Sequence, residues 1–253
     1  MLVQVRLRGK GQEIKIQHST IIKERFITAI NTAKKDEIIE IAPIKLRTVS
    51  LRIVGDTPMI FHNWSEKARK EMLDKFQNKK VKQKEPKNPC AEFAGSLYWM
   101  DGAPKVAYQD WTQETFDQYA QGARFGFPAS AIKQSALSAA YRLGYTKNKV
   151  GLTGSFFIKG EGEQQLVQIK SNGIPMMRED PVKIAMTTDL RYRGYFVEWW
   201  ADLEISYNEN GNLSLSDIVN LINLGGATVG IGEWRVEKSG QFGMFHVAAS
   251  SEE

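Results

Sequence analysis

The sequence predicts a mixed α+β fold, and three observations support that prediction. Several segments alternate between apolar and polar residues, as half-buried strands do, and Thr48–Val54 (TVSLRIV) is the clearest of them. Other segments carry apolar residues at helical spacing, with capping residues at their ends. Hydrophobic content of 42% and charged content of 25% in 253 residues are ordinary for a globular protein with a sizeable core.

The first 46 residues differ in pattern from the rest of the chain. Residues 3–7 and 13–17 alternate on both sides of a turn-like Arg-Gly-Lys-Gly stretch, which favours a hairpin or an extended arm. Residues 19–35 have helical spacing. We therefore expect residues 1–46 to form an arm or hairpin plus a helix. Residues 47–248 are then the main domain, and residues 249–253 a short tail.

Within the main domain, the strand at 48–54 is followed by a helix for which Ser65 is the expected N-cap. Its apolar stripe consists of Ala68, Met72, Leu73 and Phe76. Leu97–Met100 is a short candidate strand, and residues 101–127 have no clear pattern. Residues 128–144 predict the clearest helix, with proline in its first turn and Gly144 as its C-terminal cap.

The second half predicts strands and one more helix. Residues 154–159 and 165–170 are strands joined by Gly-Glu-Gly-Glu, a spacing typical of a hairpin. Residues 195–207 alternate as one long strand. A helix capped by Ser214 or Ser216 ends at Gly225-Gly226, and residues 243–248 form the last strand. In this order the core is β-α-β-β-α-β, a ferredoxin-like (RRM-like) plait with an insertion of about residues 57–127 after the first strand.

This insertion is basic. The formal net charge of the chain is +5, and the stretch from residue 65 to residue 88 has nine basic and four acidic residues. Nucleic acid is the usual partner of such a stretch, and a solvated lysine-rich loop is the alternative. The candidate nucleic-acid contacts in it are Lys67, Arg69, Lys70, Lys79, Lys80, Lys82 and Lys84.

The segment from Gly225 to Phe245, here called the glycine loop, is the best candidate functional element. Six of the nineteen residues from 225 to 243 are glycine. Backbone N–H groups at Gly230 and Gly232, with Arg235 and Lys238, would suit a phosphate. The loop lacks the ending of a P-loop, and it follows a helix, unlike a dinucleotide fingerprint. A set of tight turns without a ligand is the alternative.

Aromatic and basic residues lie near this loop in sequence. Exposed aromatic rings beside basic residues would stack unpaired bases, although each ring could equally be in the core or a subunit interface. The aromatic residues are Trp199, Trp200, Trp234, Phe242 and Phe245. Three arginines that either contact phosphate or pair with nearby acidic residues are Arg178, Arg191 and Arg193, in a connection too long for a simple turn.

Evidence for an enzyme is thin. The three histidines stand apart, and no metal-ligand spacing or nucleophile elbow is present, so the sequence predicts no metal and no cofactor. Cys90 is the single cysteine, which excludes an internal disulfide. His62 is the weak catalytic candidate, as the general base of a metal-independent ribonuclease. A structural or surface histidine is the competing interpretation.

The glycine loop also resembles that of a known family. Residues 230–235 (Gly-Ile-Gly-Glu-Trp-Arg) and 240–243 (Gly-Gln-Phe-Gly), placed between the second helix and last strand of a plait, are similar to the RAMP superfamily of CRISPR systems. The basic insertion resembles those of the backbone subunits that polymerise along a guide RNA. The chain is also similar to phage and prophage proteins of unassigned role.

From these observations we expect a non-catalytic protein that binds single-stranded DNA or RNA and oligomerises along the strand. The alternatives are a RAMP-like endoribonuclease that uses His62, and a phage assembly or inhibitor protein with a protein partner. The N-terminus lacks the apolar core of a secretory signal, and no apolar run is long enough to span a membrane. The expected location is the bacterial cytosol.

Overall fold

The computed structural model describes residues 44–249 except 78, 80–85, 185 and 186. The chain divides into a unit of residues 1–43 and a unit of residues 44–253, and all described residues belong to the second unit. The hairpin and helix expected before residue 44 therefore lie outside the described residues, as do the last four residues of the tail. The described part is a mixed α+β structure.

A four-stranded antiparallel sheet forms the centre of the described unit, with the strand order β10-β1-β9-β5. Strands β1 (Leu46–Gly55) and β9 (Trp200–Asn208) pair along nine residues, from Leu46 opposite Asn208 to Val54 opposite Trp200. Strand β5 (Phe156–Lys159) is on the far side of β9, and β10 (Phe245–Val247) is on the far side of β1. The strands predicted at residues 48–54 and 243–248 correspond to β1 and β10 of this sheet.

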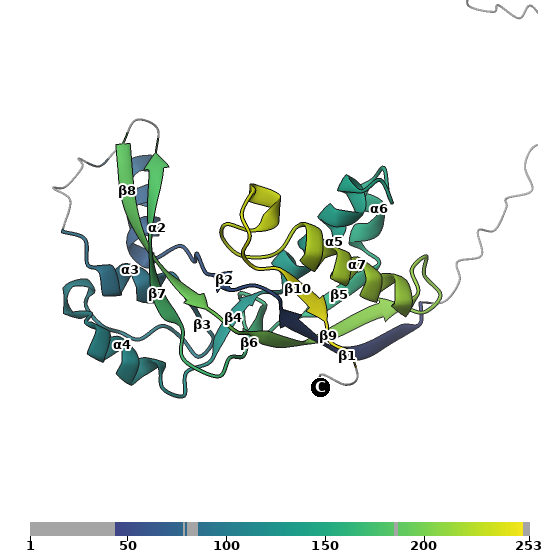
Figure 1. Cartoon of the computed structure of the whole chain (residues 1–253), viewed down its shortest axis with the longest axis horizontal. Coiled ribbons are helices and arrows are strands. Elements are labelled where there is room, and N and C mark those ends of the chain that lie inside the picture. The colour runs from purple at the N-terminus through teal and green to yellow at the C-terminus, as the bar shows by residue number, and fades with distance from the viewer. Residues whose placement is uncertain (1–43, 78, 80–85, 185–186, 250–253) are drawn as a thin grey trace, which may run out of the picture. The chain divides into compact units, whose positions relative to one another are not determined.

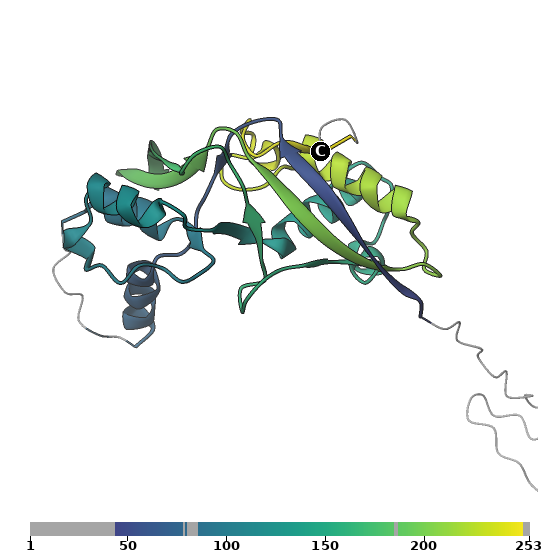
Figure 2. The ribbon, with the colours of Figure 1, turned by 90° about the horizontal axis from the view of Figure 1, so that it is seen from below.

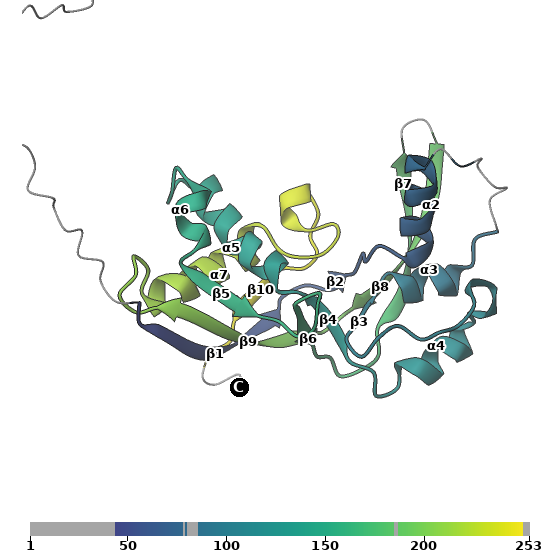
Figure 3. The same cartoon turned by 180° about the vertical axis from the view of Figure 1, so that it is seen from behind.

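Helices α5 (Ala129–Arg142) and α7 (Leu215–Thr228) cover one face of the sheet (Figures 1 and 3). The residues of β9 that are buried alternate with the residues that are not, because one face is packed and the other is open. The buried ones are Ala201, Leu203, Ile205 and Tyr207. Helix α7 begins with a capping box in which Ser214 and Asp217 bond each other's backbone, so Ser214 is the cap.

The other face of the sheet is polar. Figure 2 views the molecule from below, with β1 and β9 side by side and α7 behind them. Asp202 on β9 binds both Arg52 of β1, at 2.8 Å, and Lys170, at 2.7 Å. Glu204 binds Lys159 of β5 at 2.9 Å. The charges on this face are therefore paired with each other across the strands.

Two insertions extend from the core and pair with each other. The first, between β1 and α5, contains β2 (Met59–Ile60), α2 (Glu66–Phe76), α3 (Pro89–Gly95), β3 (Tyr98–Trp99), the 3-10 helix η1 (Tyr108–Asp110), α4 (Gln113–Ala120) and β4 (Phe125–Pro128). The second, between β5 and β9, contains β6 (Leu166–Ile169), β7 (Met176–Ile184) and β8 (Thr187–Phe196). They form two three-stranded sheets, β2-β8-β7 and β3-β4-β6. A short helix α6 (Lys149–Thr153) follows α5, and a 3-10 helix η2 (Val236–Lys238) lies in the glycine loop.

The predicted single insertion was therefore incomplete, and the predicted hairpin was wrong. Strand β5 pairs with β9 and strand β6 with β4, and only the bridge between Glu161 and Leu166 joins the two segments. The two strands belong to different sheets, β5 to the four-stranded sheet and β6 to the sheet β3-β4-β6, and each buries its apolar residues there. The long strand at 195–207 is also divided, because β8 ends at Phe196 and β9 begins at Trp200.

Two helices behave differently from each other. Helix α5 occurs where the sequence predicted it. Small residues on both helices let α5 and α7 approach closely, because a Cβ on Gly225 of α7 would lie 2.6 Å from the backbone nitrogen of Ala136 of α5. Helix α2 begins at its predicted cap Ser65. Its stripe is not part of the core, however, because Met72, Leu73 and Phe76 are exposed in the described unit.

Candidate functional site

The glycines of the glycine loop have two structural roles. Gly225 and Gly226 permit close packing at the end of α7, where a Cβ on Gly226 would lie 1.9 Å from the carbonyl oxygen of Phe245. Gly230, Gly232 and Gly243 have φ angles of 71°, 82° and 67°, in the left-handed region that favours glycine. The loop is thus folded into tight turns against β10 and the β1–β2 connection.

Most backbone N–H groups of the glycine loop already donate to protein oxygens. Gly230 donates to Gly225, Ile231 to Gly243, Glu233 to Ile60 and Gly243 to Pro58, at 2.8–3.0 Å. These bonds stabilise the turns, and they take up donors that a phosphate-binding loop would direct at its ligand. The N–H of Gly230 is therefore not available to the expected phosphate cradle, whereas the N–H of Gly232 is not among these donors.

Arg235 is held inside the loop. Its Nε and Nη2 donate to Glu237 Oε2 at 3.0 and 2.7 Å, and its Nη1 donates to the carbonyl oxygen of Gly232 at 3.2 Å. Arg142 of α5 binds the other oxygen of Glu237 at 2.7 Å. Burial opposes ionisation of Glu237, but the two arginines outweigh it and keep its pKa below the ordinary value. Lys238, by contrast, is exposed.

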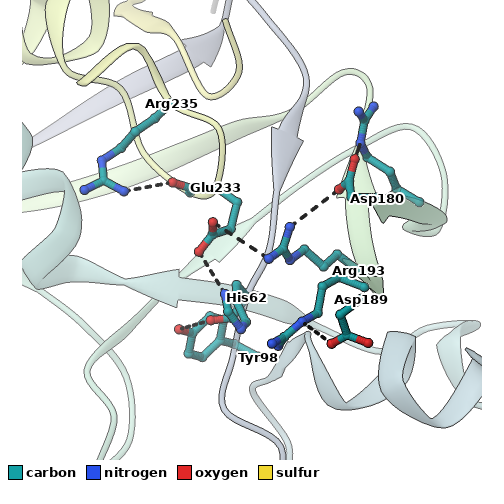
Figure 4. A network of polar contacts seen from close by, with 10 residues as sticks. His62, Tyr98, Asp180, Asp189, Arg193, Glu233 and Arg235 are labelled. Atoms are coloured by element: carbon teal, nitrogen blue, oxygen red, sulfur yellow. Dashed lines mark hydrogen bonds and ion pairs between the residues drawn. The ribbon is translucent and has the colours of Figure 1, made fainter. Parts of the chain in front are cut away.

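His62 and Glu233 connect the loop to the first insertion. His62 Nδ1 lies 2.8 Å from Glu233 Oε1, and the hydroxyl of Tyr98 donates to the backbone oxygen of His62 at 3.5 Å (Figure 4). The hydrogen bond from His62 is the largest influence on Glu233 and lowers its pKa, with help from Arg193 and Arg235 and against the effect of burial. Burial raises the pKa of Tyr98.

The contact with Glu233 also orients the imidazole of His62. A carboxylate at Nδ1 favours the tautomer that carries its proton there and leaves Nε2 as the acceptor. The hydrogen bonds found among the described residues do not involve His62 Nε2. In this arrangement, His62 Nε2 can accept a hydrogen bond or a proton from a group placed next to it.

His62 lines a pocket of about 240 Å³ between the glycine loop and α5. The residues of α5 that line it are Ala131, Gln134, Ser135 and Ser138. The loop contributes Val229–Glu233, Arg235 and Glu237, and the end of β4 contributes Phe127. Segments that are far apart in the sequence thus form a single small cavity.

Charged residues line one face of the β7–β8 hairpin, beside this region. Arg178 is opposite Arg193, and Asp180 is opposite Arg191. Arg178 Nε binds Asp180 Oδ1 at 2.8 Å, and the guanidinium of Arg178 lies 4.8 Å from the ring centroid of Phe242 in the glycine loop. The hairpin therefore contacts the loop through both a charge and an aromatic ring.

Arg193 is the most buried of these arginines, with a side chain only 8% exposed. Its Nη1 lies 3.6 Å from Asp180 Oδ2, and its Nη2 lies 4.0 Å from Glu233 Oε2 (Figure 4). Both distances permit electrostatic attraction and exceed a normal hydrogen bond. Buried polar atoms left without a hydrogen bond include Nε and Nη1 of Arg193, together with Asp180 Oδ2.

Two exposed tryptophans flank the His62–Glu233 contact in sequence. Trp64 is two residues after His62 and is 52% exposed, and Trp234 follows Glu233 and is 41% exposed. Trp199 and Phe245 belong to the core, and the Nε1 of Trp199 donates to the carbonyl oxygen of Thr57 at 2.9 Å. Trp64 and Trp234 therefore have solvent-accessible rings on the two segments that the His62–Glu233 contact joins.

Not all predicted nucleic-acid contacts lie in this region. The Nζ of Lys67 lies 3.8 Å from the ring centroid of Tyr108, Lys79 binds Asp74, and Arg69 and Lys70 are exposed on α2. Arg191 pairs with Asp189, which Lys87 also contacts. Lys80, Lys82 and Lys84 lie outside the described residues.

Sequence reasoning missed Glu233, Tyr98 and the pairing of β7 with β8. Glu233 directly follows the Gly-x-Gly motif that drew attention to the loop, and a carboxylate there was a usable signal. Tyr98 and the hairpin had no comparable signal. Among residues 44–249, apart from the gaps, no group of three or more metal-ligating side chains occurs, and no helix is long and apolar enough to cross a membrane.

Comparison with models of protein families and with curated protein sequences finds no match to this chain.

Proposed function

We propose that this protein binds single-stranded nucleic acid on a ferredoxin-like core of the RAMP type. The strand order β10-β1-β9-β5 supports this core, because a β-α-β-β-α-β chain arranged as strands four, one, three and two gives the same antiparallel sheet. Helix α5 occupies the place of its first helix and α7 that of its second. The glycine loop then precedes the last strand, as in the family that it resembles.

The exposed pair of tryptophans is the observation that carries the proposal. Trp64 and Trp234 lie on segments joined by the His62–Glu233 hydrogen bond, and both rings are accessible. Aromatic rings next to basic side chains stack unpaired bases without regard to their identity. Arg69 and Lys70, which are exposed on the helix that follows Trp64, supply positive charge for the phosphates of the strand.

Titrations of single-stranded DNA, single-stranded RNA and duplex at two salt concentrations test this proposal. We expect single strands to bind more tightly than duplex, with an affinity that falls as salt rises. Trp64→Ala and Trp234→Ala each remove one stacking partner and should weaken binding by about 5- to 100-fold. Tyr119→Ala is the matched control, because Tyr119 is 46% exposed but lies on α4, outside the site.

Equal affinity of wild type and both tryptophan variants, or an affinity independent of salt, would contradict the proposal. If no nucleic acid binds and a protein partner co-purifies in a defined complex, the alternative of an assembly or inhibitor protein is favoured instead.

A metal-independent endoribonuclease is the second candidate, and the His62–Glu233 contact favours it. The contact leaves His62 Nε2 as an acceptor that could take the proton of a ribose 2′-hydroxyl. Cleavage of RNA in the presence of a chelator, lost in His62→Ala and reduced in Glu233→Gln, would establish it. Cleavage that persists in His62→Ala, or no cleavage by wild type, would exclude it.

Assembly of several copies along a strand remains part of the proposal. Exposed apolar side chains on and after α5 (Tyr141, Leu143, Tyr145 and Val150) are suited to contacts between neighbouring subunits. Native mass spectrometry with oligonucleotides of increasing length tests it, since the number of bound copies should rise in steps. A single copy at every length would limit the function to binding by a monomer.

A further inference from the structure

The size and lining of the pocket between α5 and the glycine loop limit the kind of ligand that can bind there. Phe127, Ala131, Val229 and Ile231 contribute apolar surface to a cavity of about 240 Å³. Pockets for drug-sized molecules begin at roughly 300 Å³. The cavity therefore suits one small, largely apolar group, and polar atoms at its rim determine which one.

An anionic group is disfavoured in this pocket. Arg235 and His62 both line the pocket, but Arg235 is already paired with Glu237 and His62 is hydrogen-bonded to Glu233, and both carboxylates also line it. A phosphate would bring a further negative charge next to two carboxylates, and like charges in such a setting repel. A neutral group avoids this repulsion.

Gln134 and His62 are the polar groups of the pocket that remain available for a neutral ligand. The two serines are already engaged, because the hydroxyl of Ser135 donates to the backbone oxygen of Ile132 at 2.7 Å and that of Ser138 accepts from Lys149 at 3.1 Å. The side-chain amide of Gln134 is exposed at the rim and has no hydrogen bond among the described residues. It offers both a donor and an acceptor, and His62 Nε2 offers an acceptor.

We infer that this pocket receives one unpaired nucleobase, turned out of the bound strand, and that Gln134 reads its edge. A base is neutral and flat, and its edge combines donors and acceptors that an amide can pair with. The exposed tryptophans would stack its neighbours in the strand. This inference rests on the proposed function, because it assigns a base-specific subsite to the same surface.

A variant that fills the pocket tests the inference without a nucleic-acid strand. Free adenosine, guanosine, cytidine and uridine are titrated by ligand-observed NMR up to about 10 mM, a range that detects weak binding. We expect at least one nucleoside to bind wild type and to lose most of its binding in Ala131→Leu. The matched control is Ala103→Leu, at an exposed alanine outside the pocket. No nucleoside binding to wild type, or equal binding to Ala131→Leu, overturns the inference.

Gln134→Glu provides a readout that a purely structural role would not change. Glutamate only accepts hydrogen bonds, so the preferred nucleoside should shift toward one that presents an amino donor, such as cytidine. Unchanged preference in this variant would remove Gln134 from the inference. Because Gln134 is exposed, the variant should fold as wild type does, which its thermal unfolding curve checks.

An oligonucleotide with one abasic position separates this inference from the proposed function. If the base enters the pocket, some abasic position should weaken binding to wild type by about 5-fold or more, and Ala131→Leu should bind the intact and abasic strands equally. Strand binding that is insensitive to every abasic position contradicts the pocket but leaves the proposed function in place. Nucleoside binding without any strand binding would support a nucleoside site in the pocket but contradict the proposed function.

Discussion

The glycine loop and the β7–β8 hairpin meet at the candidate site, and they satisfy their polar groups in opposite ways. The loop directs most of its N–H groups at its own carbonyl oxygens or at the β1–β2 connection, and its Arg235 makes three hydrogen bonds. The hairpin instead buries Arg193 and Asp180 with polar atoms that lack a hydrogen bond. A buried polar atom of this kind costs free energy in the folded protein.

The loop is thus shaped by packing and the hairpin by charge. Every glycine of the loop that approaches a backbone atom has a structural reason for being glycine, so the density of glycines need not signal a ligand. The buried charges of the hairpin have no equivalent structural explanation, because apolar residues would fill the same place at lower cost. The hairpin is therefore the better place to look for residues retained for function.

The largest expected effect comes from removing the buried guanidinium. Arg193→Met leaves Asp180 and Glu233 without their shared cation and should reduce the free energy of unfolding by about 3 kcal/mol. The double variant Arg193→Met/Asp180→Leu replaces the loose ion pair with apolar groups and should recover most of that loss. Chemical denaturation measures both, and a double variant less stable than the single one would contradict the comparison.

A smaller effect is expected from overpacking the glycine loop. A Cβ on Gly226 would lie 1.9 Å from the carbonyl oxygen of Phe245, so Gly226→Ala should destabilise the protein by about 2 kcal/mol. Gly173→Ala is the control, because a Cβ there meets no atom within 4 Å. If thermal unfolding shows the two variants to be equally stable, close packing is not the reason for glycine at position 226.

The His62–Glu233 contact predicts a modest dependence of stability on pH. The pKa of Glu233 is lower in the folded protein than in the unfolded chain, chiefly because of the hydrogen bond to His62. Its contribution is therefore present above the ordinary carboxyl pKa of about 4.3 and is lost as the pH falls through the folded value. Between about pH 6 and about pH 3, wild type should lose more stability than Glu233→Gln, by less than about 1 kcal/mol because the side chain is partly exposed. Identical pH profiles in urea denaturation would show that the contact adds nothing.

The smallest effect is expected toward the tip of the hairpin. Lys87 binds Asp189 and donates to the carbonyl oxygen of Leu190 at 2.8 Å, but both charged side chains are partly exposed. Lys87→Ala should change the free energy of unfolding by only about 0.5 kcal/mol, because solvent screens the pair. A loss as large as that of Arg193→Met would mean that burial is not what distinguishes the two ion pairs.

The sequence predicted the core better than the insertions. Strands β1 and β10 and helices α5 and α7 have alternation or helical spacing and clear caps, and these local signals were sufficient. The hairpin β7–β8 was missed because its charged face interrupts the apolar pattern, with arginine and aspartate where a strand normally has buried apolar residues. Strand β6 was assigned the wrong partner because a short glycine-rich turn does not reveal which sheet each strand joins.

The candidate site was predicted only in part. His62, Trp234 and Arg235 were identified, and the structure brings all three to the region of the pocket. The partner of His62 could not be predicted, because Glu233 lies far from it in the sequence and meets it only through the fold, as Glu237 meets Arg142. Local spacing contains no information about such contacts.

The pairing of the two insertions has a consequence for how the chain reaches its native state. Strand β2 pairs with β8 across more than a hundred residues, and β1 finds its edge partner only in β10, near the end of the described chain. Loop-closure entropy opposes such distant pairings, so they form late. During synthesis, the rings of Phe61 and Phe125 in the first insertion therefore stay partly uncovered until Phe196, which contacts both, has left the ribosome.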